Sequence, residues 1–305
     1  MSIFIPEISA LMRVPVEDHF HEPELRRLAL EFLEYKAAEI SVFGQLAALH
    51  CRMFGGDEEL ADCAAAASEL AILALDIYDD LQDNDNDSAP WSKVEPFFAL
   101  NVAIGLQALS LETIRRGLRN DPGKATAALA ILNRSVIRAV NGQHADLRNE
   151  FATEEECLRM IAEKSGALVA GVCLAGTAMA TGDYNDIVAA YGEAIGVAAQ
   201  IRNDIAGIER WDRRNDILFR KRTLPVLFVL EQAGEEASLL QAYYEQRISK
   251  EELLDNKVEL MRYIRSCGCI EYAHVIARLK GFDAESALMM LQVDDYWKEQ
   301  LRYYM

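Results

Sequence analysis

The sequence predicts an all-α fold, a bundle of about ten helices in a single domain that spans residues 1–305. Three observations favour it. No proline occurs between Gly123 and Leu224, and this stretch is rich in alanine, leucine, isoleucine and glutamate. Apolar residues recur at steps of three and four, and no long run alternates as a half-buried strand does. With 51% hydrophobic residues, the chain can bury a large core.

Turn signals separate the expected helices. After Gly55 and Gly56, Asp57 is suited to cap a helix, and the two glutamates that follow favour its first turn. The apolar face of this helix is predicted at Leu70, Leu73, Ile77 and Leu81. Further turn signals lie at residues 84–90, 120–123, 181–183 and 212–215. Residues 61–74 and 167–180 are rich in small side chains, as inner helices of a large bundle are, and such bundles carry their sites on facing helices.

The composition excludes several classes of partner. There are 49 acidic and 31 basic residues, a net charge of −18, so nucleic acid and anionic membrane surfaces are poor partners. No uninterrupted apolar run is long enough to span a membrane, and no signal peptide is visible, which predicts a cytoplasmic protein. The six cysteines are expected to be reduced thiols. Cys267 and Cys269, which lack a second pair, are expected to be structural rather than zinc ligands.

An acidic helix is the strongest functional signal. Residues 57–87 contain eleven acidic side chains and no basic one. On a helix Asp76, Asp79, Asp80 and Asp83 share one face, where the carboxylates repel one another without a local cation. One interpretation is a solvated acidic face. The apolar residues of the same helix favour a magnesium site, because oxygen ligands without histidine or cysteine suit Mg²⁺. A calcium loop is excluded, because Ser88 and Val94 stand where an EF-hand needs glycine and glutamate.

A second polar cluster lies downstream. Gln200, Asn203 and Asp204 share a helix face, and seven basic and four acidic residues lie between Arg202 and Arg222. The basic run alone fits a solvated loop equally well. Together with Mg²⁺ on carboxylates, these bases are what a diphosphate leaving group requires.

Four motifs in order resemble the trans-isoprenyl diphosphate synthases, the class I all-α prenyltransferases with a central cavity, over residues 30–280. The motifs are Asp79-Asp80-Leu81-Gln82-Asp83, Gly142-Gln143-His144-Ala145-Asp146, Lys164-Ser165-Gly166-Ala167-Leu168, and Asp216 with Lys221-Arg222-Thr223-Leu224-Pro225. They match DDxxD, GQxxD, K-[TS]-G-x-L and D-x4-K-x-TLP of that family.

The resemblance implies a function and a site. The chain would ionise an allylic isoprenyl diphosphate, of geranyl or farnesyl type, as a cytoplasmic homodimer. Mg²⁺ would bind to Asp79, Asp80, Asp83, Asp204 and Asn203, and the diphosphate to Lys164, Lys221, Arg222 and Gln200. Gln143 would take part in catalysis with Lys164 and the aspartates, whereas His144 is expected to pack or hydrogen-bond. Ala74 and Leu75, one turn before the first motif, would leave depth for the hydrocarbon tail.

Three departures from the family pattern concern the acceptor. Residues 39–44 lack the lysine and arginine that hold isopentenyl diphosphate, Lys36 is about one turn too early, and Arg52 is the remaining candidate. The Arg-Arg-Gly after the first motif is missing, and Trp91 and Lys93 occupy that region. The second aspartate motif keeps only Asp204. These features most resemble the ComQ-type branch, whose members prenylate a tryptophan of a pheromone peptide.

Other functions stay open at this point. A chain-elongating synthase would use other residues for isopentenyl diphosphate, and a class I terpene cyclase would need no second substrate. A non-catalytic subunit would keep the fold and lose part of the site. The intact first motif and Lys164 favour an enzyme.

Overall fold

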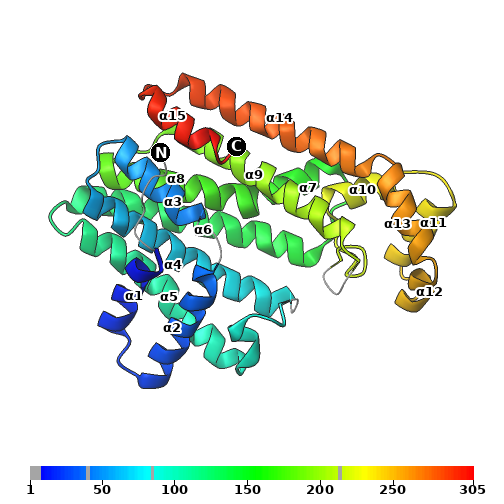
Figure 1. The fold of residues 1–305 in the computed structure, drawn as a ribbon, viewed down its shortest axis with the longest axis horizontal. Helices are drawn as coiled ribbons and strands as arrows, with labels where there is room; N and C mark the ends of the chain where they lie inside the picture. The colour runs from blue at the N-terminus through cyan, green and yellow to red at the C-terminus, as the bar shows by residue number, and fades with distance from the viewer. Residues whose placement is uncertain (1–7, 39–41, 84–85, 212–214) are drawn as a thin grey trace.

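A computed structural model describes residues 8–38, 42–83, 86–211 and 215–305, and every regular element in these ranges is helical (Figure 1). The α-helices are α1 (Ile8–His19), α2 (Pro23–Ala37), α3 (Val42–Met53), α4 (Glu58–Asp83), α5 (Pro96–Gly117), α6 (Pro122–Arg148), α7 (Glu154–Ile161), α8 (Ala167–Thr181), α9 (Asp186–Glu209), α10 (Leu224–Leu230), α11 (Glu235–Tyr244), α12 (Lys250–Asp255), α13 (Lys257–Ser266), α14 (Cys269–Met290) and α15 (Asp295–Arg302). Two single turns add to them, the 3-10 turn η1 (Pro90–Lys93) and the π-helical turn η2 (Ala162–Gly166).

The all-α class predicted from the sequence is confirmed, but the predicted number of helices is too low. The described part of the chain forms fifteen α-helices rather than about ten. Much of the excess comes from α10 to α13, which have six to ten residues each. A helix of two or three turns offers too few repeats for a 3.6-residue apolar period to be visible in a sequence.

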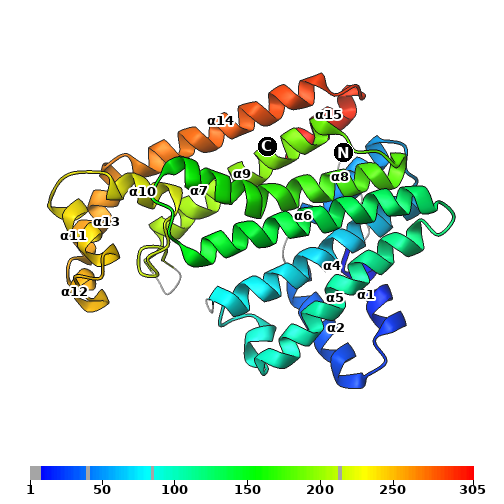
Figure 2. The same cartoon turned by 180° about the vertical axis from the view of Figure 1, so that it is seen from behind.

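The long helices run side by side along the molecule. Helix α4 packs against both α3 and α5, α8 packs against α3, α6 and α9, and α14 lies along α9. The short helices α10 to α13 gather at one end, and α1 and α2 lie on the side away from α14, as both views show (Figures 1 and 2). This arrangement leaves the C-terminal half of α4 facing α6 and α9 across the bundle.

Helix α4 shows how local sequence builds the element that carries the first motif. The side chain of Asp57 accepts a hydrogen bond from the backbone N–H of Leu60 (2.9 Å), which caps the helix. Alanines in its first half allow α3 and α5 to pack closely, and Leu70, Leu73 and Ile77 are fully buried farther along. This burial fixes the rotation of α4 and so decides where its last two turns point.

Three apolar clusters hold the bundle together. The largest joins α1 to α6 with α8, α9, α14 and α15. A second lies among α10, α11, α13 and the start of α14, and a third lies between α7, α9, α10 and α14. Cys269 is fully buried in the second cluster, as the structural role predicted from the sequence requires, and Cys267 is half-buried beside it.

Helix α5 is the one helix of the described residues that is long and apolar enough to cross a membrane. In the structure one face of α5 packs against α4, and Ala99, Val102 and Leu106 are fully buried there. Its other face exposes Phe97 and Ile104. Helix α5 therefore serves as a bundle helix with one uncovered apolar side.

Candidate active site

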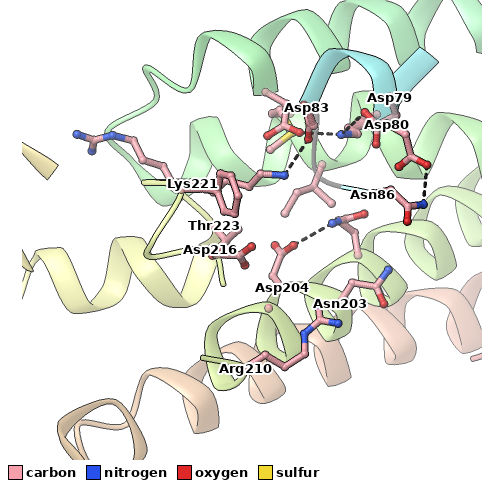
Figure 3. Close-up of a pocket in the computed structure, with 18 residues that line it drawn as sticks. Asp79, Asp80, Asp83, Asn86, Asn203, Asp204, Arg210, Asp216, Lys221 and Thr223 are labelled. Carbon is pink, nitrogen blue, oxygen red and sulfur yellow. Dashed lines mark hydrogen bonds and ion pairs between the residues drawn. The ribbon is translucent and has the colours of Figure 1, made fainter. Parts of the chain in front are cut away.

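The first aspartate motif lies at the end of α4. Asp79, Asp80 and Asp83 line a polar cavity of about 320 Å³, and Asp204 and Asp216 line its opposite side (Figure 3). The last turn of α4 has no basic residue, although the C-terminal end of a helix disfavours negative charge. The positive partners of these carboxylates therefore have to come from other elements.

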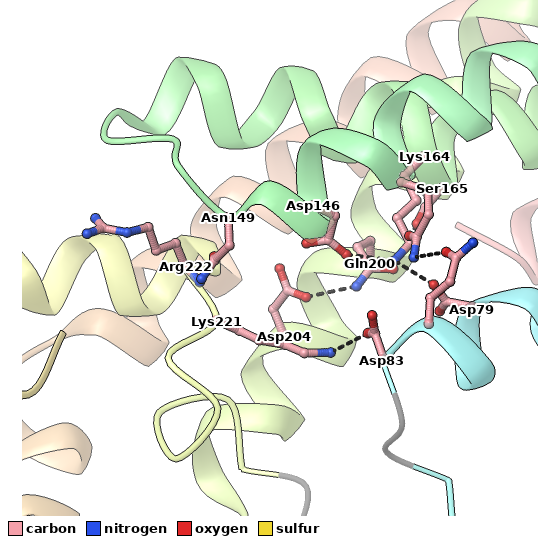
Figure 4. Close-up of polar contacts among 12 residues, drawn as sticks. Asp79, Asp83, Asp146, Asn149, Lys164, Ser165, Gln200, Asp204, Lys221 and Arg222 are labelled. Atoms are coloured by element: carbon pink, nitrogen blue, oxygen red, sulfur yellow. Dashed lines mark hydrogen bonds and ion pairs between the residues drawn. The ribbon is translucent and has the colours of Figure 1, made fainter. Parts of the chain in front are cut away.

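Two lysines supply that positive charge. The Lys164 Nζ lies 2.7 Å from the Asp146 carboxylate and 3.2 Å from that of Asp79, and the Lys221 Nζ lies 2.8 Å from Asp83 Oδ2 (Figure 4). Burial favours the neutral amine of Lys164, yet the nearby carboxylates keep its pKa above the ordinary value. Burial raises the pKa of Asp79 in spite of Lys164. These pairs bring together motifs more than eighty residues apart in the sequence.

Lys164 is presented by an irregular turn. It belongs to η2, where one extra residue per turn rotates the following side chains relative to an α-helix. Gly142 of α6 lies against this turn, and a Cβ on it would come within 2.4 Å of the Lys164 backbone nitrogen. The glycine of the GQxxD motif is thus needed for the close approach of α6 that places Asp146 beside Lys164.

Helix α9 provides the second half of the cavity. The Gln200 amide donates to Asp204 Oδ1 (2.9 Å) and accepts from the Ser165 hydroxyl (2.8 Å). Asp204 is buried, and burial raises its pKa to about 7 although the Gln200 hydrogen bond works against this shift. Asn203, which is exposed, lies on the cavity rim. Gln200 therefore orients Asp204, and its amide is already engaged on both sides.

A further carboxylate stands where the second motif lacks one. Gly207 occupies the last position of that motif, and a Cβ on it would lie 2.3 Å from Asp216 Oδ2. The Asp216 carboxylate thus fills the space beside α9 that a longer side chain at residue 207 would take. The sequence contained Asp216 in the fourth motif but did not show that it faces Asp204, because the two come from different elements.

The predicted diphosphate ligand Arg222 lines the polar cavity, but no ion pair joins it to a carboxylate of the described residues. Its guanidinium lies 5.8 Å from the centre of the Tyr244 ring and points away from Asp83, while Lys221 points toward it (Figure 4). The Arg222 backbone N–H donates to Asn149 Oδ1 (2.8 Å). This hydrogen bond fixes the backbone of the loop before α10, so the side chains of Lys221 and Arg222 point in opposite directions. Arg210 also lines the cavity, and sequence reasoning missed it within the basic run.

An apolar cavity of about 540 Å³ adjoins the polar one, and Asp79, Lys164, Gln200 and Asn203 line both. Leu75 lines it, as expected for a residue that leaves depth for a hydrocarbon tail. Ala74 does not, because it is fully buried in the main apolar cluster. Tyr304, near the end of the sequence, also lines the cavity, and its hydroxyl donates to Gln45 Oε1 (2.8 Å). No sequence pattern pointed to Tyr304.

Gln143 and His144 lie on the same side of the apolar cavity. The Gln143 Nε2 donates to Gln82 Oε1 (3.1 Å), and its own Oε1 is buried without a hydrogen-bond partner in the part of the chain that the structure describes. A buried polar atom of this kind is costly unless a ligand pairs with it. His144 is exposed at the cavity, so of its two expected roles packing is wrong, and hydrogen bonding stays a prediction.

Arg52 is remote from the site, which contradicts its candidacy as a base for isopentenyl diphosphate. It pairs with Glu58 and approaches Asp62 at the start of α4. Asp62 and Asp79 are 17 residues apart on this helix, about 25 Å at 1.5 Å per residue. Lys36 on α2 lies nearer, and its Nζ is 2.7 Å from Asp76 Oδ2. Residues 39–41 of the predicted acceptor segment lie outside the described residues.

The carboxylates fit Mg²⁺ as a substrate-bridging ion. Among the described residues, no group of three or more acidic, histidine or cysteine side chains converges closely enough to hold a metal alone. Mg²⁺ usually keeps several waters and binds through one or two carboxylates together with substrate phosphates. Carboxylates on α4 and α9 that face each other across about 320 Å³ suit that mode of binding.

The chain is similar in sequence and in fold to known proteins. Residues 41–261 match the polyprenyl synthetase family model. The chain is 31% identical to the tryptophan prenyltransferase ComQ of Bacillus subtilis (strain 168), over 95% of both chains. It is 29% identical to the geranylgeranyl diphosphate synthase of Sulfolobus acidocaldarius, over 74% of this chain and 72% of the relative. The fold is similar to the crystal structure of a polyprenyl synthase from Caulobacter crescentus CB15 complexed with calcium and isoprenyl diphosphate (TM-score 0.81, 21% identity, 98% of this chain and 92% of that one).

Proposed function

The chain belongs to the polyprenyl synthetase family and is a transferase of prenyl groups, and from this premise we propose that it transfers the prenyl group of an allylic diphosphate to a tryptophan of a peptide, with Mg²⁺ as its cofactor. The donor would be of geranyl or farnesyl type. The observation that carries the proposal is the pair of adjoining cavities, one polar with facing carboxylates and two lysines, the other apolar. An allylic diphosphate also has a polar half, its diphosphate group, and an apolar half, its hydrocarbon chain.

The residues have distinct tasks in the proposed reaction. Asp79, Asp80, Asp83 and Asp204 would hold the metal, and Asn203 at the rim is a weaker oxygen ligand. Bound Mg²⁺ supplies Lewis acidity that stabilises negative charge on the departing oxygen. Lys164 and Lys221, which pair with carboxylates in this structure, would move to the diphosphate oxygens.

The carbon–oxygen bond would break with its electron pair leaving on the diphosphate. The allylic cation is then left in the apolar cavity, where the side chains exclude water. The indole ring of the acceptor attacks the cation and forms a carbon–carbon bond, and the proton that the ring then loses would pass to the released diphosphate, so no strong base from the protein is needed. Gln143, whose Oε1 is buried without a hydrogen-bond partner among the described residues, lines this cavity.

The absence of bases argues against a second diphosphate. Lys164 is the only lysine or arginine among the described residues that line the apolar cavity, and it already contacts two carboxylates. A second buried anion without its own cations would be costly. Lys36, paired with Asp76 beside this cavity, is the one observation that favours the alternative, a chain-elongating synthase.

A homodimer is part of the proposal. Helix α5 exposes Phe97 and Ile104, and α6 exposes Ile137. Helices α5 and α6 pack against each other, so these residues belong to neighbouring parts of the surface. An uncovered apolar area on two long helices favours association with a second copy.

The proposal is tested by mass spectrometry of parallel incubations. Purified protein with Mg²⁺ and farnesyl or geranyl diphosphate is given either isopentenyl diphosphate or a tryptophan-containing peptide encoded beside its gene. Expected is a prenylated peptide and little or no longer diphosphate. Asp80→Ala and a peptide with phenylalanine in place of tryptophan are the controls, and both should give no product. Efficient elongation with an unmodified peptide would instead establish the synthase.

A further inference from the structure

The loop after the first motif holds Asp80 through an indole. Trp91 lies on η1 and is only 2% exposed, and its Nε1–H donates to Asp80 Oδ2 at 2.7 Å. The Asn86 amide donates to the same oxygen, also at 2.7 Å (Figure 3). We propose that Trp91 is a positioning residue that fixes the Asp80 carboxylate for metal binding, in the loop where this chain lacks the Arg-Arg-Gly of the synthases. The inference rests on the proposed metal site.

The position of Trp91 is set by packing. Its ring meets Phe32 edge to face (centroids 5.5 Å apart, 76°) and Tyr35 in the same way (5.2 Å, 83°). Phe32 is fully buried on α2, and η1 also packs against α4 and α5, so the indole is held by packing rather than lying on a free loop. A buried indole N–H needs an acceptor, and Asp80 provides it. Because packing against α2 fixes the indole, its N–H also fixes the orientation of the Asp80 carboxylate on α4.

The three aspartates of the motif differ in the kind of partner that they have. Asp79 and Asp83 pair with Lys164 and Lys221, whose long flexible side chains carry charge that a diphosphate can compete for. Trp91 is neutral, buried and rigid, so a diphosphate cannot draw it away from Asp80. When the substrate arrives, the lysines would exchange partners while the Asp80 hydrogen bond persists. Groups that hold metal ligands in this way typically contribute ten- to a hundredfold to metal affinity.

The test measures metal binding apart from turnover. Trp91→Phe keeps a ring between Phe32 and Tyr35 and removes only the N–H donor. Binding of Mn²⁺ is followed by electron paramagnetic resonance in the presence of inorganic diphosphate. Trp91→Phe should weaken it roughly ten- to a hundredfold. It should also lower kcat more than it changes the KM for farnesyl diphosphate. Trp297→Phe, the same change on α15 away from both cavities, should bind Mn²⁺ like the unmodified protein.

Two further variants separate the possible failures. Trp91→His keeps an N–H donor on a smaller ring and should recover most of the Mn²⁺ affinity even if its melting temperature is lower. Equal losses in Trp91→Phe and Trp91→His would show that packing, not the donor, matters, and would overturn the inference. So would normal affinity in Trp91→Phe together with loss of affinity in Asp80→Ala. If Asp80→Ala also binds Mn²⁺ normally, the proposed metal site itself is wrong.

Discussion

At the residue scale, Asp204 shows how burial prepares a carboxyl group for a cation. Its side chain is enclosed by α9 and its neighbours, and burial raises its pKa from 3.8 to about 7. The Gln200 hydrogen bond only partly offsets this rise. In the metal-free protein near neutral pH, Asp204 therefore holds a proton about half of the time. Metal binding must displace that proton, so the affinity for Mg²⁺ should increase as the pH rises through 7.

The same shift predicts a pH-dependent stability for Asp204→Asn. Between pH 4 and pH 7 native Asp204 keeps a proton that the unfolded chain releases, so the metal-free protein loses stability as the pH rises through this window. Asparagine cannot ionise, and its amide oxygen can still accept from Gln200. Without metal the variant should match the unmodified protein near pH 4. It should exceed it by up to a few kcal/mol at pH 8, at about 1.4 kcal/mol per pKa unit.

Urea unfolding with a chelator at pH 4 and pH 8 measures this difference. Prenyl transfer by the same variant, assayed with Mg²⁺, should fall because a metal ligand is lost. A stability gain that is equal at both pH values would show that Asp204 does not titrate in this window.

At the scale of elements, the π-helical turn η2 depends on its contact with α6. The predicted change is Gly142→Ala, whose Cβ would come within 2.4 Å of the Lys164 backbone nitrogen. Because backbone cannot yield as a side-chain tip can, we expect a loss of about 1–3 kcal/mol in the free energy of unfolding. Prenyl transfer should fall as well, since Lys164 moves with η2.

Gly123→Ala in the first turn of the same helix is the matched control. The nearest atom to its added Cβ is 3.5 Å away, so this variant should be as stable as the unmodified protein or slightly more so. Chemical denaturation of both variants gives the comparison. Equal stabilities would mean that α6 and η2 can separate without cost.

The segment after α15 forms one wall of the apolar cavity. Tyr304 lines it, and the Arg202 guanidinium donates to the Met305 carbonyl oxygen (2.5 Å), which holds this segment against α9. Removing the Tyr304 ring should enlarge the cavity. Tyr304→Ala is expected to shift the ratio of activities toward longer donors, such as geranylgeranyl over farnesyl diphosphate, by roughly tenfold.

Competition between the two donors, with products separated by mass, measures that ratio. Tyr303→Ala is the control, because Tyr303 is 80% exposed and does not line the cavity. An unchanged ratio in Tyr304→Ala would show that another wall limits the length of the donor.

At the scale of the whole molecule, the two sides of the polar cavity supply more carboxylates than Lys164 and Lys221 neutralise. Carboxylates on α4 face Asp204 and Asp216 across the polar cavity. Mg²⁺ together with inorganic diphosphate should raise the melting temperature more than either alone. Each ligand offsets the charge of the other in the cavity, so the two bind more tightly together. Differential scanning calorimetry with each ligand and with both provides the measurement. If both ligands together cause no shift, the non-catalytic alternative gains support.

The proposed dimer gives a prediction about assembly. If α5 and α6 contact a second copy around a twofold axis, Ile104→Glu adds one negative charge from each copy to the interface. We expect this variant to be a folded monomer by light scattering and circular dichroism. Val275→Glu on α14 makes the same change on another exposed apolar face and should leave the dimer intact. A dimeric Ile104→Glu would exclude this face.

Features that depend on near neighbours in the chain could be predicted from the sequence alone. The apolar spacing in α4 and the proline-free stretch predicted helices, and the spacing of Asp79, Asp80 and Asp83 predicted one carboxylate face. These features follow from a period of 3.6 residues, which any sequence displays directly. The same logic failed for the short helices α11 and α12, where too few turns repeat.

Contacts between side chains from different helices could not be predicted in this way. Lys221 reaches Asp83, while its neighbour Arg222 points away. Arg52 on α3 pairs with Glu58 at the far end of α4, and Trp91 donates to Asp80. Each outcome depends on how helices rotate and cross when their apolar faces are buried, and spacing along the chain does not contain that information. The sequence therefore showed which chemical groups are present, and packing between helices assigned their partners.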